Sequence, residues 1–277
     1  MSTGTTATIT HTAPSRLGPT FARCRQEGRS ALIGYLPVGY PTVEKSVEFF
    51  RAMVEAGCDI IEVGVPYSDP VMDGPTIQEA ADTALAAGVR VRDVFTAVQA
   101  ISDAGGQSVV MSYWNPVLQY GIDRFSRDLA SAGGAGLITP NLIPEEGAAW
   151  HTASDDHGLD RIYLVAPSST NERLAMTVDA SRGFIYAAST MGVTGARDAV
   201  SDAAPELCAR VRAHSDIPIG VGLGVRNKAQ AAEIAAYADG VIVGSALVSA
   251  AKAGTRDLSA LVGELADGVR SASPATS

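Results

Sequence analysis

One short pattern recurs along the chain and constrains its fold more than any other feature. A helical stretch ends in Ala, a Gly or another small residue follows, and a short apolar run then stops at Gly or Pro. The three copies are residues 56–64, 132–140 and 236–244. Glycine suits the C-terminus of a helix, and uninterrupted apolar runs suit strands that are buried on both faces. The pattern therefore predicts repeated helix-to-strand junctions of a parallel sheet.

Further apolar runs of the same kind extend the pattern to eight strands. They are predicted near residues 31–36, 59–63, 108–113, 136–139, 161–165, 183–187, 218–222 and 240–243. Amphipathic helical stretches lie between them. Residues 42–56 predict one such helix, with Thr42 as its N-cap and an apolar face made of Val43, Val47, Phe50 and Val54.

Eight βα units in 277 residues favour an α/β fold, the closed (β/α)8 TIM barrel, as a single domain. An open doubly wound sheet is the alternative, but the first strand leads into Pro-Val-Gly-Tyr-Pro at 37–41 instead of a glycine-rich fingerprint. No linker divides the chain. We expect the barrel to span residues 18–270, between a flexible N-terminal tail of residues 1–17 and a flexible C-terminal tail of residues 271–277.

Charge and cysteine content exclude several classes of partner. The formal net charge is −9 and no basic stripe is present, so we expect neither nucleic acid nor an anionic membrane surface as a partner. The chain has no apolar run of 18 residues and its first 17 residues lack the apolar core of a signal peptide. Its three cysteines form no CxxC motif, which fits the reducing cytoplasm.

Carboxylates near the end of the second strand are the first candidate site residues. Glu62 lies in an otherwise apolar run, and in a barrel of this kind the chemistry sits where strands end. Burial there would raise its pKa and make it usable as both acid and base. A carboxylate paired with arginine or capped by hydrogen bonds is an equally weighted alternative. Asp69 and Asp73 follow in a loop rich in Pro and Gly, where each alone could simply form a turn. Together, Glu62 and Asp73 bracket a structured loop.

Glycines after the last three strands are typical of a phosphate site. The sixth strand runs into residues 189–195, the seventh into 222–224, and the eighth into Gly244-Ser245 at the start of a helix. Barrels often hold phosphate with these loops and a helix N-terminus. Ordinary tight βα turns also favour Gly, and remain the alternative.

The chain lacks the residues that a Schiff-base or a metal-dependent barrel enzyme would need. The three lysines, Lys45, Lys228 and Lys252, fall in predicted helices or at their starts, so a Schiff-base aldolase is not indicated. None of the four histidines sits at the C-terminal end of a predicted strand, so no metal site is expected. Acid–base chemistry without a metal, on a small phosphorylated molecule, remains.

These motifs resemble the signature of tryptophan synthase alpha chains, in family order from about residue 18 to 270. The segments that carry the resemblance are 62–70, 73–78, 113–116, 192–195, 222–224 and 244–245. The resemblance implies retro-aldol cleavage of indole-3-glycerol phosphate to indole and glyceraldehyde 3-phosphate. Glu62 would be the catalytic acid–base and Asp73 the carboxylate on the indole N–H. The other matched positions are substrate-lining Tyr35, Tyr113, Tyr186 and Thr194, and phosphate-binding Gly195, Gly224, Gly244 and Ser245.

The resemblance also implies a partner. The family works as an α2β2 complex in which the beta chain holds pyridoxal phosphate and receives indole, so no cofactor is expected in this chain. Residues 189–196 would form a lid. Tyr40 and Asn141 depart from the commonest family pattern, in which Asp stands at both positions. A free-standing indole-3-glycerol-phosphate lyase and a non-catalytic, phosphate-binding activator of a beta chain remain alternatives.

Overall fold

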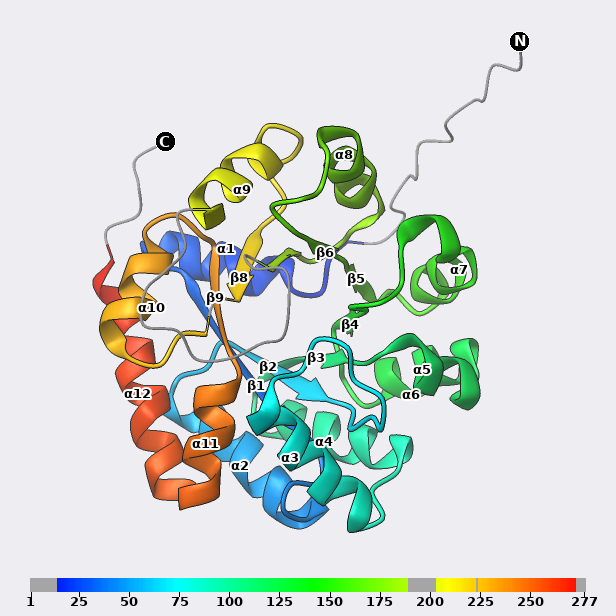
Figure 1. Ribbon diagram of the computed structural model, residues 1–277, viewed down its shortest axis with the longest axis vertical. Coiled ribbons are helices and arrows are strands. Elements are labelled where there is room, and N and C mark those ends of the chain that lie inside the picture. The colour runs from blue at the N-terminus through cyan, green and yellow to red at the C-terminus, as the bar shows by residue number, and fades with distance from the viewer. Residues whose placement is uncertain (1–13, 189–202, 223, 273–277) are drawn as a thin grey trace.

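The computed structural model describes residues 14–188, 203–222 and 224–272. Parallel strands form a ring with helices outside it (Figure 1). The strands are β1 (Ala31–Pro37), β2 (Ile60–Gly64), β3 (Gln107–Met111), β4 (Gly136–Ile138), β5 (Asp160–Ile162), β6 (Leu164–Val165), β7 (Ile185–Ala188), β8 (Ile219–Gly222) and β9 (Gly240–Val243). Each lies at a predicted strand position, so the TIM barrel prediction is confirmed.

The ninth strand label arises because one predicted strand is interrupted. β5 and β6 are separated only by Tyr163, and the predicted strand 161–165 covers most of both. β5 pairs with β4 while β6 pairs with β7, so the two ends of the sheet belong to one continuous segment. The backbone N–H of Tyr186 donates to the carbonyl of Tyr163 at 3.1 Å across this junction. The segment thereby brings the barrel to near closure.

Helices surround the barrel. They are α1 (Gly18–Gln26), α2 (Val43–Ala56), α3 (Pro75–Ala86), α4 (Val91–Asp103), α5 (Trp114–Tyr120), α6 (Ile122–Ser131), the 3₁₀ turn η1 (Pro144–Glu146), α7 (Ala148–Asp156), α8 (Asn171–Ala180), α9 (Ala203–Arg212), α10 (Lys228–Ala235), α11 (Ser245–Ala253) and α12 (Thr255–Ser271). The Thr42 hydroxyl accepts the N–H of Lys45 at 3.2 Å, which confirms the predicted N-cap of α2.

The buried side of α2 differs from the prediction. It is centred on Phe49, Phe50 and Met53, whereas Val43, Val47 and Val54 are only partly buried. The reason is that α2 contacts α4 and α12 as well as β1 and β2. A helix with neighbours on several sides buries a wider arc than a single apolar stripe.

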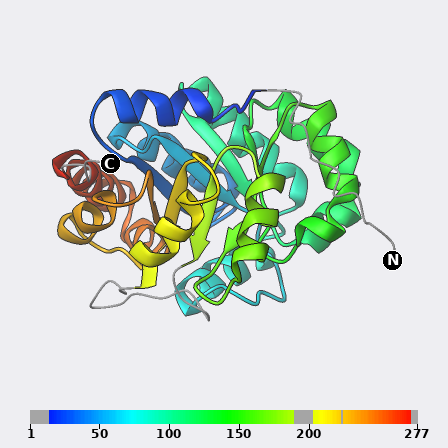
Figure 2. The same ribbon diagram turned by 90° about the horizontal axis from the view of Figure 1, so that it is seen from above.

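Alternate strand residues fill the barrel interior, and α1 closes one end of it (Figure 2). Phe21 of α1 packs on Phe184 with their ring centroids 5.8 Å apart. Since α1 covers the N-terminal ends of the strands, the opposite, C-terminal end is the one left for a site. The interior cluster consists of Leu17, Phe21, Cys24, Ala31, Ile33, Ile60, Val109, Ala135, Ile138, Ile162, Phe184 and Ile242.

Residues 15–17, which the sequence placed in a flexible tail, are anchored instead. The Arg16 guanidinium donates to the carbonyls of Gly134, His157 and Gly158 at 2.8–2.9 Å. The N–H of Leu17 donates to the Asp160 carboxylate at 2.9 Å. The predicted tail is therefore too long at its inner end, because these bonds tie its last residues to the barrel. Residues 1–13 and 273–277 lie outside the described part of the chain, and the remaining tail boundaries stay predictions.

Every helix among the described residues is too short or too polar to cross a membrane. The described His, Cys, Asp and Glu side chains form no group of three or more that could hold a metal ion. The cysteines Cys24, Cys58 and Cys208 are all buried free thiols.

Candidate active site

Glu62 is the central residue of β2, two residues before its C-terminal end, in register with Tyr35 of β1 and Val109 of β3. It shares its face of the strand with Ile60, which belongs to the interior cluster, so its side chain points into the barrel. The side chain is 1% exposed, and the described residues give its Oε2 atom no hydrogen-bond partner.

Burial raises the pKa of Glu62 from 4.5 to about 8, and the charge of Asp73 adds to the rise. An arginine partner would have lowered this pKa. The electrostatics therefore favour the acid–base interpretation over the ion-paired alternative. A group with this pKa can both give and take a proton near neutral pH.

Two tyrosines, Tyr35 on the neighbouring strand β1 and Tyr186 on β7 across the barrel, reach toward Glu62, and glycines make room for their rings. A Cβ atom on Gly64 would lie 2.4 Å from the Tyr35 hydroxyl, and one on Gly222 would lie 2.7 Å from the Tyr186 hydroxyl. Burial, with the charges of Glu62 and Asp73, raises the pKa of both phenols well above 10. Tyr35 and Tyr186 thus reach the same end of the barrel as Glu62, as the sequence predicts.

Asp73 is the second carboxylate at this end. It lies near the end of the loop that joins β2 to α3, and the Gln78 side chain donates to its backbone carbonyl at 2.7 Å. Burial raises the pKa of Asp73 from 3.8 to about 6, and a hydrogen bond from Tyr113 works against that rise. Asp69, by contrast, is exposed and accepts only from Ser68 in its described contacts, so it fits the turn-forming alternative.

The two carboxylates divide into two chemical states at neutral pH. Glu62, with a pKa of about 8, is mostly protonated, while Asp73, with a pKa of about 6, is mostly ionised. Titratable groups whose pKa values are separated in this way are typical acid–base pairs. Glu62 can move a proton, and Asp73 can face a developing positive charge.

Gly244 and Ser245 lie at the end of β9 and the start of α11, and Gly244 is beside Tyr35. A Cβ atom on Gly244 would meet Tyr35 at 3.7 Å, an ordinary contact, and its φ is −114°. The described neighbours therefore do not require glycine here, whereas close approach of a ligand would. The first N–H groups of α11 have no partners within the helix and suit an anion.

The loop after β8 contributes the third phosphate candidate. Gly224 has φ +66°, a left-handed backbone conformation that favours glycine. Thr194, Gly195 and the expected lid of residues 189–196 lie outside the described residues.

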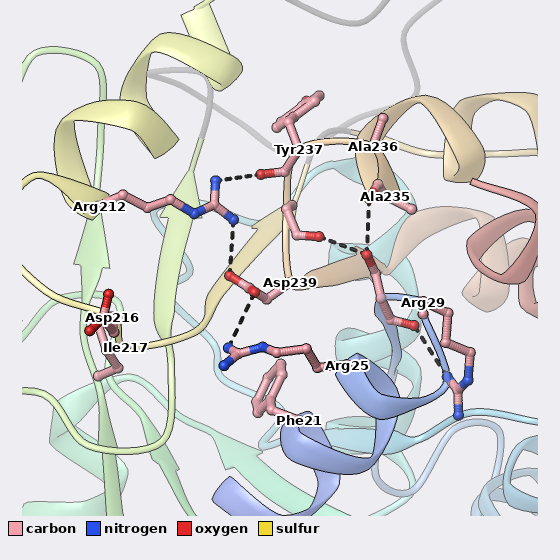
Figure 3. Close-up of a pocket in the computed structure, with 13 residues that line it drawn as sticks. Phe21, Arg25, Arg29, Arg212, Asp216, Ile217, Ala235, Ala236, Tyr237 and Asp239 are labelled. Atoms are coloured by element: carbon pink, nitrogen blue, oxygen red, sulfur yellow. Dashed lines mark hydrogen bonds and ion pairs between the residues drawn. The ribbon is translucent and has the colours of Figure 1, made fainter. Parts of the chain in front are cut away.

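A separate cavity of about 670 Å³ lies at the other end of the barrel (Figure 3). Its charged groups are largely paired with each other. Arg212 and Arg25 both face the Asp239 carboxylate, at 3.1 and 3.7 Å, and Arg212 also donates to the Tyr237 carbonyl. The cavity is at the N-terminal ends of β1, β8 and β9, so it is separate from Glu62.

Sequence reasoning missed three contacts that shape the site. The role of Gln78 could have been suspected from its place in the first turns of α3, from which a side chain can reach back to the preceding loop. Asn141 accepts the backbone N–H of Trp114, the first residue of α5, at 2.8 Å. Tyr40 is buried and lines a cavity of about 330 Å³ with Thr76 and Lys252. No sequence signal indicates the contacts of Asn141 or Tyr40.

The raised pKa of Glu62 has a consequence for stability. Between pH 4.5 and 8 the folded chain holds a proton on Glu62 that the unfolded chain has lost, so stability falls as pH rises through this window. Glutamine cannot ionise. We expect Glu62→Gln to match the wild type near pH 5 and to be more stable by about 2–4 kcal/mol at pH 8.5.

Urea unfolding at pH 5 and pH 8.5 measures this difference. Glu55→Gln, at an exposed position on α2, is the matched control and should show no pH-dependent gain. Equal stabilities of Glu62→Gln and wild type at pH 8.5 would mean that Glu62 is not held in a desolvated site.

Comparisons with known proteins agree with the geometry. The family model for the tryptophan synthase alpha chain matches residues 21–272. The chain is 74% identical to the tryptophan synthase alpha chain of Nocardia farcinica over 262 residues, covering 95% of this chain and 98% of the relative. It superposes on a chain of Mycobacterium tuberculosis tryptophan synthase with a TM-score of 0.91 and 70% identity, covering 93% and 99% of the two chains. A tryptophan synthase alpha subunit from Legionella pneumophila has a TM-score of 0.81 at 30% identity, with 93% and 99% covered. A barrel with two carboxylates of separated pKa at its open end, matched over nearly its whole length, thus belongs to the tryptophan synthase alpha chain family.

Proposed function

We propose that the chain cleaves indole-3-glycerol phosphate into indole and glyceraldehyde 3-phosphate. One observation carries this proposal: a buried, proton-holding Glu62 and an ionised Asp73 face the same barrel end, beside the N-terminus of α11. The reaction needs a proton taken from the glycerol hydroxyl and a proton given to indole C3. It also needs the positive charge on the ring stabilised and the phosphate held in place. Each requirement has a residue at this end.

Glu62 would perform both proton transfers. Protonated Glu62 gives its proton to C3 of indole, and its carboxylate then takes the proton of the hydroxyl on the adjoining glycerol carbon. As that hydroxyl becomes an aldehyde, the bond between this carbon and indole C3 breaks and its electron pair returns to the ring. Glu62 ends the cycle protonated, as it began, which suits a pKa of about 8.

Asp73 would stabilise the intermediate. Protonation at C3 places positive charge on the ring and acidifies the indole N–H. An ionised carboxylate that accepts a hydrogen bond from this N–H opposes the charge where it develops. The Asp73 pKa of about 6 keeps the group ionised at neutral pH. Because these two carboxylates supply the chemistry, we propose that the chain uses no cofactor or metal of its own.

The phosphate would lie against Gly244, Ser245 and Gly224, with Gly195 completing the cradle from outside the described residues. Tyr35, Tyr113 and Tyr186 would line the indole and glycerol part of the pocket, and Thr194 would join them from the lid. The N-terminus of α11 provides the favourable field for the anion.

We further propose a beta chain as the partner, in an α2β2 assembly whose beta chain holds pyridoxal phosphate. Three of the four large apolar side chains that are exposed among the described residues support a docking face: Val71, Leu118 and Ile143, at 43–69% exposure. Val71 and Ile143 lie in the loops that follow β2 and β4, and Leu118 lies in α5, which follows β3. Exposed apolar groups on a protein surface suit a protein partner.

The buried free thiols suit a reducing compartment, and we propose that the chain is located in the cytoplasm.

Indole release from indole-3-glycerol phosphate tests the proposal, first with the purified chain and then with a tryptophan synthase beta chain added. Slow release that rises strongly with the partner supports an alpha subunit. Fast release without a partner indicates a free-standing lyase. If no indole is formed under either condition, the chain is a binding or activating subunit and the proposed reaction is wrong.

Removing the Ser245 hydroxyl tests the phosphate end separately. We expect Ser245→Ala to raise KM for indole-3-glycerol phosphate by about five- to ten-fold with little change in kcat, because one hydrogen bond to a charged group is lost. Ser249→Ala, one turn later on α11 and exposed, is the control. A fall in kcat with KM unchanged would place Ser245 at the reacting carbons instead of the phosphate.

A further inference from the structure

The hydroxyl of Tyr113 has an unusual set of partners at the open end of the barrel. Tyr113 follows β3, precedes α5 and is 5% exposed. Its hydroxyl oxygen accepts the backbone N–H groups of Val71 and Met72, at 3.1 and 3.0 Å. These are consecutive amides of the loop that carries Asp73. A side chain from one strand end thus holds the backbone of a loop from the neighbouring strand.

The chemistry of a phenol fixes the direction of its remaining bond. A tyrosine hydroxyl has two acceptor lone pairs and one proton to donate. The two loop amides use its acceptor capacity, so the proton is left for a further acceptor. The two amide bonds tie the backbone immediately before Asp73 to the phenol, and from this placement we infer that the Asp73 carboxylate accepts the proton. A hydrogen bond from Tyr113 also lowers the pKa of Asp73 against the effect of burial.

We propose that Tyr113 is a positioning residue that aims the Asp73 carboxylate at the reacting ring through its hydroxyl. This inference rests on the proposed function and deepens it, because it assigns Tyr113 a task beyond lining the pocket. In this task the Tyr113 hydroxyl acts through Asp73, while the ring lines the pocket.

Other contacts also hold the loop, so the effect of the Tyr113 hydroxyl can be tested separately from that of its ring. Gln78 holds the backbone carbonyl of Asp73, and the Tyr67 ring packs on the Tyr113 ring with centroids 5.2 Å apart. Asn141 fixes the backbone just after Tyr113 through the N–H of Trp114. Phenylalanine at position 113 would keep the ring contact and lose only the three hydroxyl bonds. The Gln78 and ring contacts should keep the loop folded, its Val71 and Met72 amides should be less protected, and the Asp73 carboxylate should lose its orienting donor.

The test compares Tyr113→Phe with Tyr120→Phe. Tyr120 is a matched control, because its hydroxyl also donates to a carboxylate, Asp128, at 2.7 Å on the outside of the barrel. We expect Tyr113→Phe to lower kcat about ten-fold with KM changed less than two-fold, the loss of one hydrogen bond to a charged group. The acid limb of the kcat profile should move to higher pH, since Asp73 becomes harder to ionise. Tyr120→Phe should leave kcat, KM and the limb unchanged.

Repeating the Tyr113→Phe substitution in an Asp73→Asn chain shows whether Tyr113 acts through Asp73. In an Asp73→Asn chain, Tyr113→Phe should change kcat less than two-fold, because the group it positions is already disabled. A full ten-fold loss in that background, or a raised KM with an unmoved acid limb, would overturn the proposal and make Tyr113 a substrate contact.

A readout without turnover separates this inference from the proposed reaction. ¹³C NMR titration of the Asp73 carboxyl in the ligand-free chain should show a higher pKa in Tyr113→Phe than in wild type, and the Val71 and Met72 amides should exchange faster. If Asp73 has the same pKa in Tyr113→Phe as in wild type, and the wild-type chain releases indole, only the positioning role is overturned. If Asp73 has a higher pKa in Tyr113→Phe than in wild type, but the wild-type chain never releases indole, the hydroxyl positions Asp73 and the proposed reaction is wrong.

Discussion

Glu62→Gln is expected to lower indole release from indole-3-glycerol phosphate by about a thousand-fold or more while the barrel stays folded. General acid–base catalysis by one positioned group is worth roughly 10²–10⁴ in rate, and here one group would serve two proton transfers. The glutamine amide has nearly the same volume as the acid but neither gives nor takes a proton at neutral pH.

The substitution isolates chemistry from packing for a further reason. Because the pKa of Glu62 is about 8, the wild-type side chain is already mostly neutral at pH 7, and a neutral amide in its place adds no unpaired charge to the interior. Steady-state indole release at pH 7.5, with circular dichroism to verify folding, measures the effect. Glu55→Gln should retain full activity. A Glu62→Gln chain with turnover within ten-fold of wild type would remove Glu62 from the proton transfers.

The barrel was predictable from sequence because local patterns are repeated in it. Most strands are short apolar runs bounded by Gly, Pro or a small residue, and each predicted run overlaps a strand of the structure. The exception is β5, which is Asp-Arg-Ile. What local pattern could not show was the break at Tyr163, which depends on β5 and β6 pairing with strands on opposite sides. The anchoring of Arg16 was also invisible, since its three acceptor carbonyls lie more than a hundred residues away.

Part of the candidate site could be predicted from the sequence and part could not. The position of Glu62 in the second strand could be predicted, because the apolar run on both sides of it marks that strand. The split between the pKa values of Glu62 and Asp73 requires their actual burial, which the sequence supplies only as an expectation. The Tyr113 and Gln78 contacts depend on the path of an irregular loop, and no periodicity encodes that path.

Asp73→Asn is expected to lower kcat by about 10²–10³ while KM for indole-3-glycerol phosphate changes only a few-fold. Asparagine keeps the size of the side chain and an oxygen that accepts from the indole N–H, but it lacks the negative charge. Loss of an electrostatic group that acts mainly on the transition state lowers kcat. The phosphate contacts proposed for Gly244 and Ser245 do not involve Asp73, so binding should persist.

The pH profile gives the same variant a second, independent signature. Asp73 must be ionised to oppose ring charge, so wild-type kcat should fall as pH drops below about 6, the pKa that burial gives this carboxyl. Asparagine does not titrate, so the variant should show a low kcat without this acid limb. Indole release measured from pH 5 to 8 at saturating substrate tests both points. A variant that loses only affinity, with kcat and the acid limb intact, would show that Asp73 binds the substrate without stabilising charge, and the catalytic role would then fall to Glu62 alone.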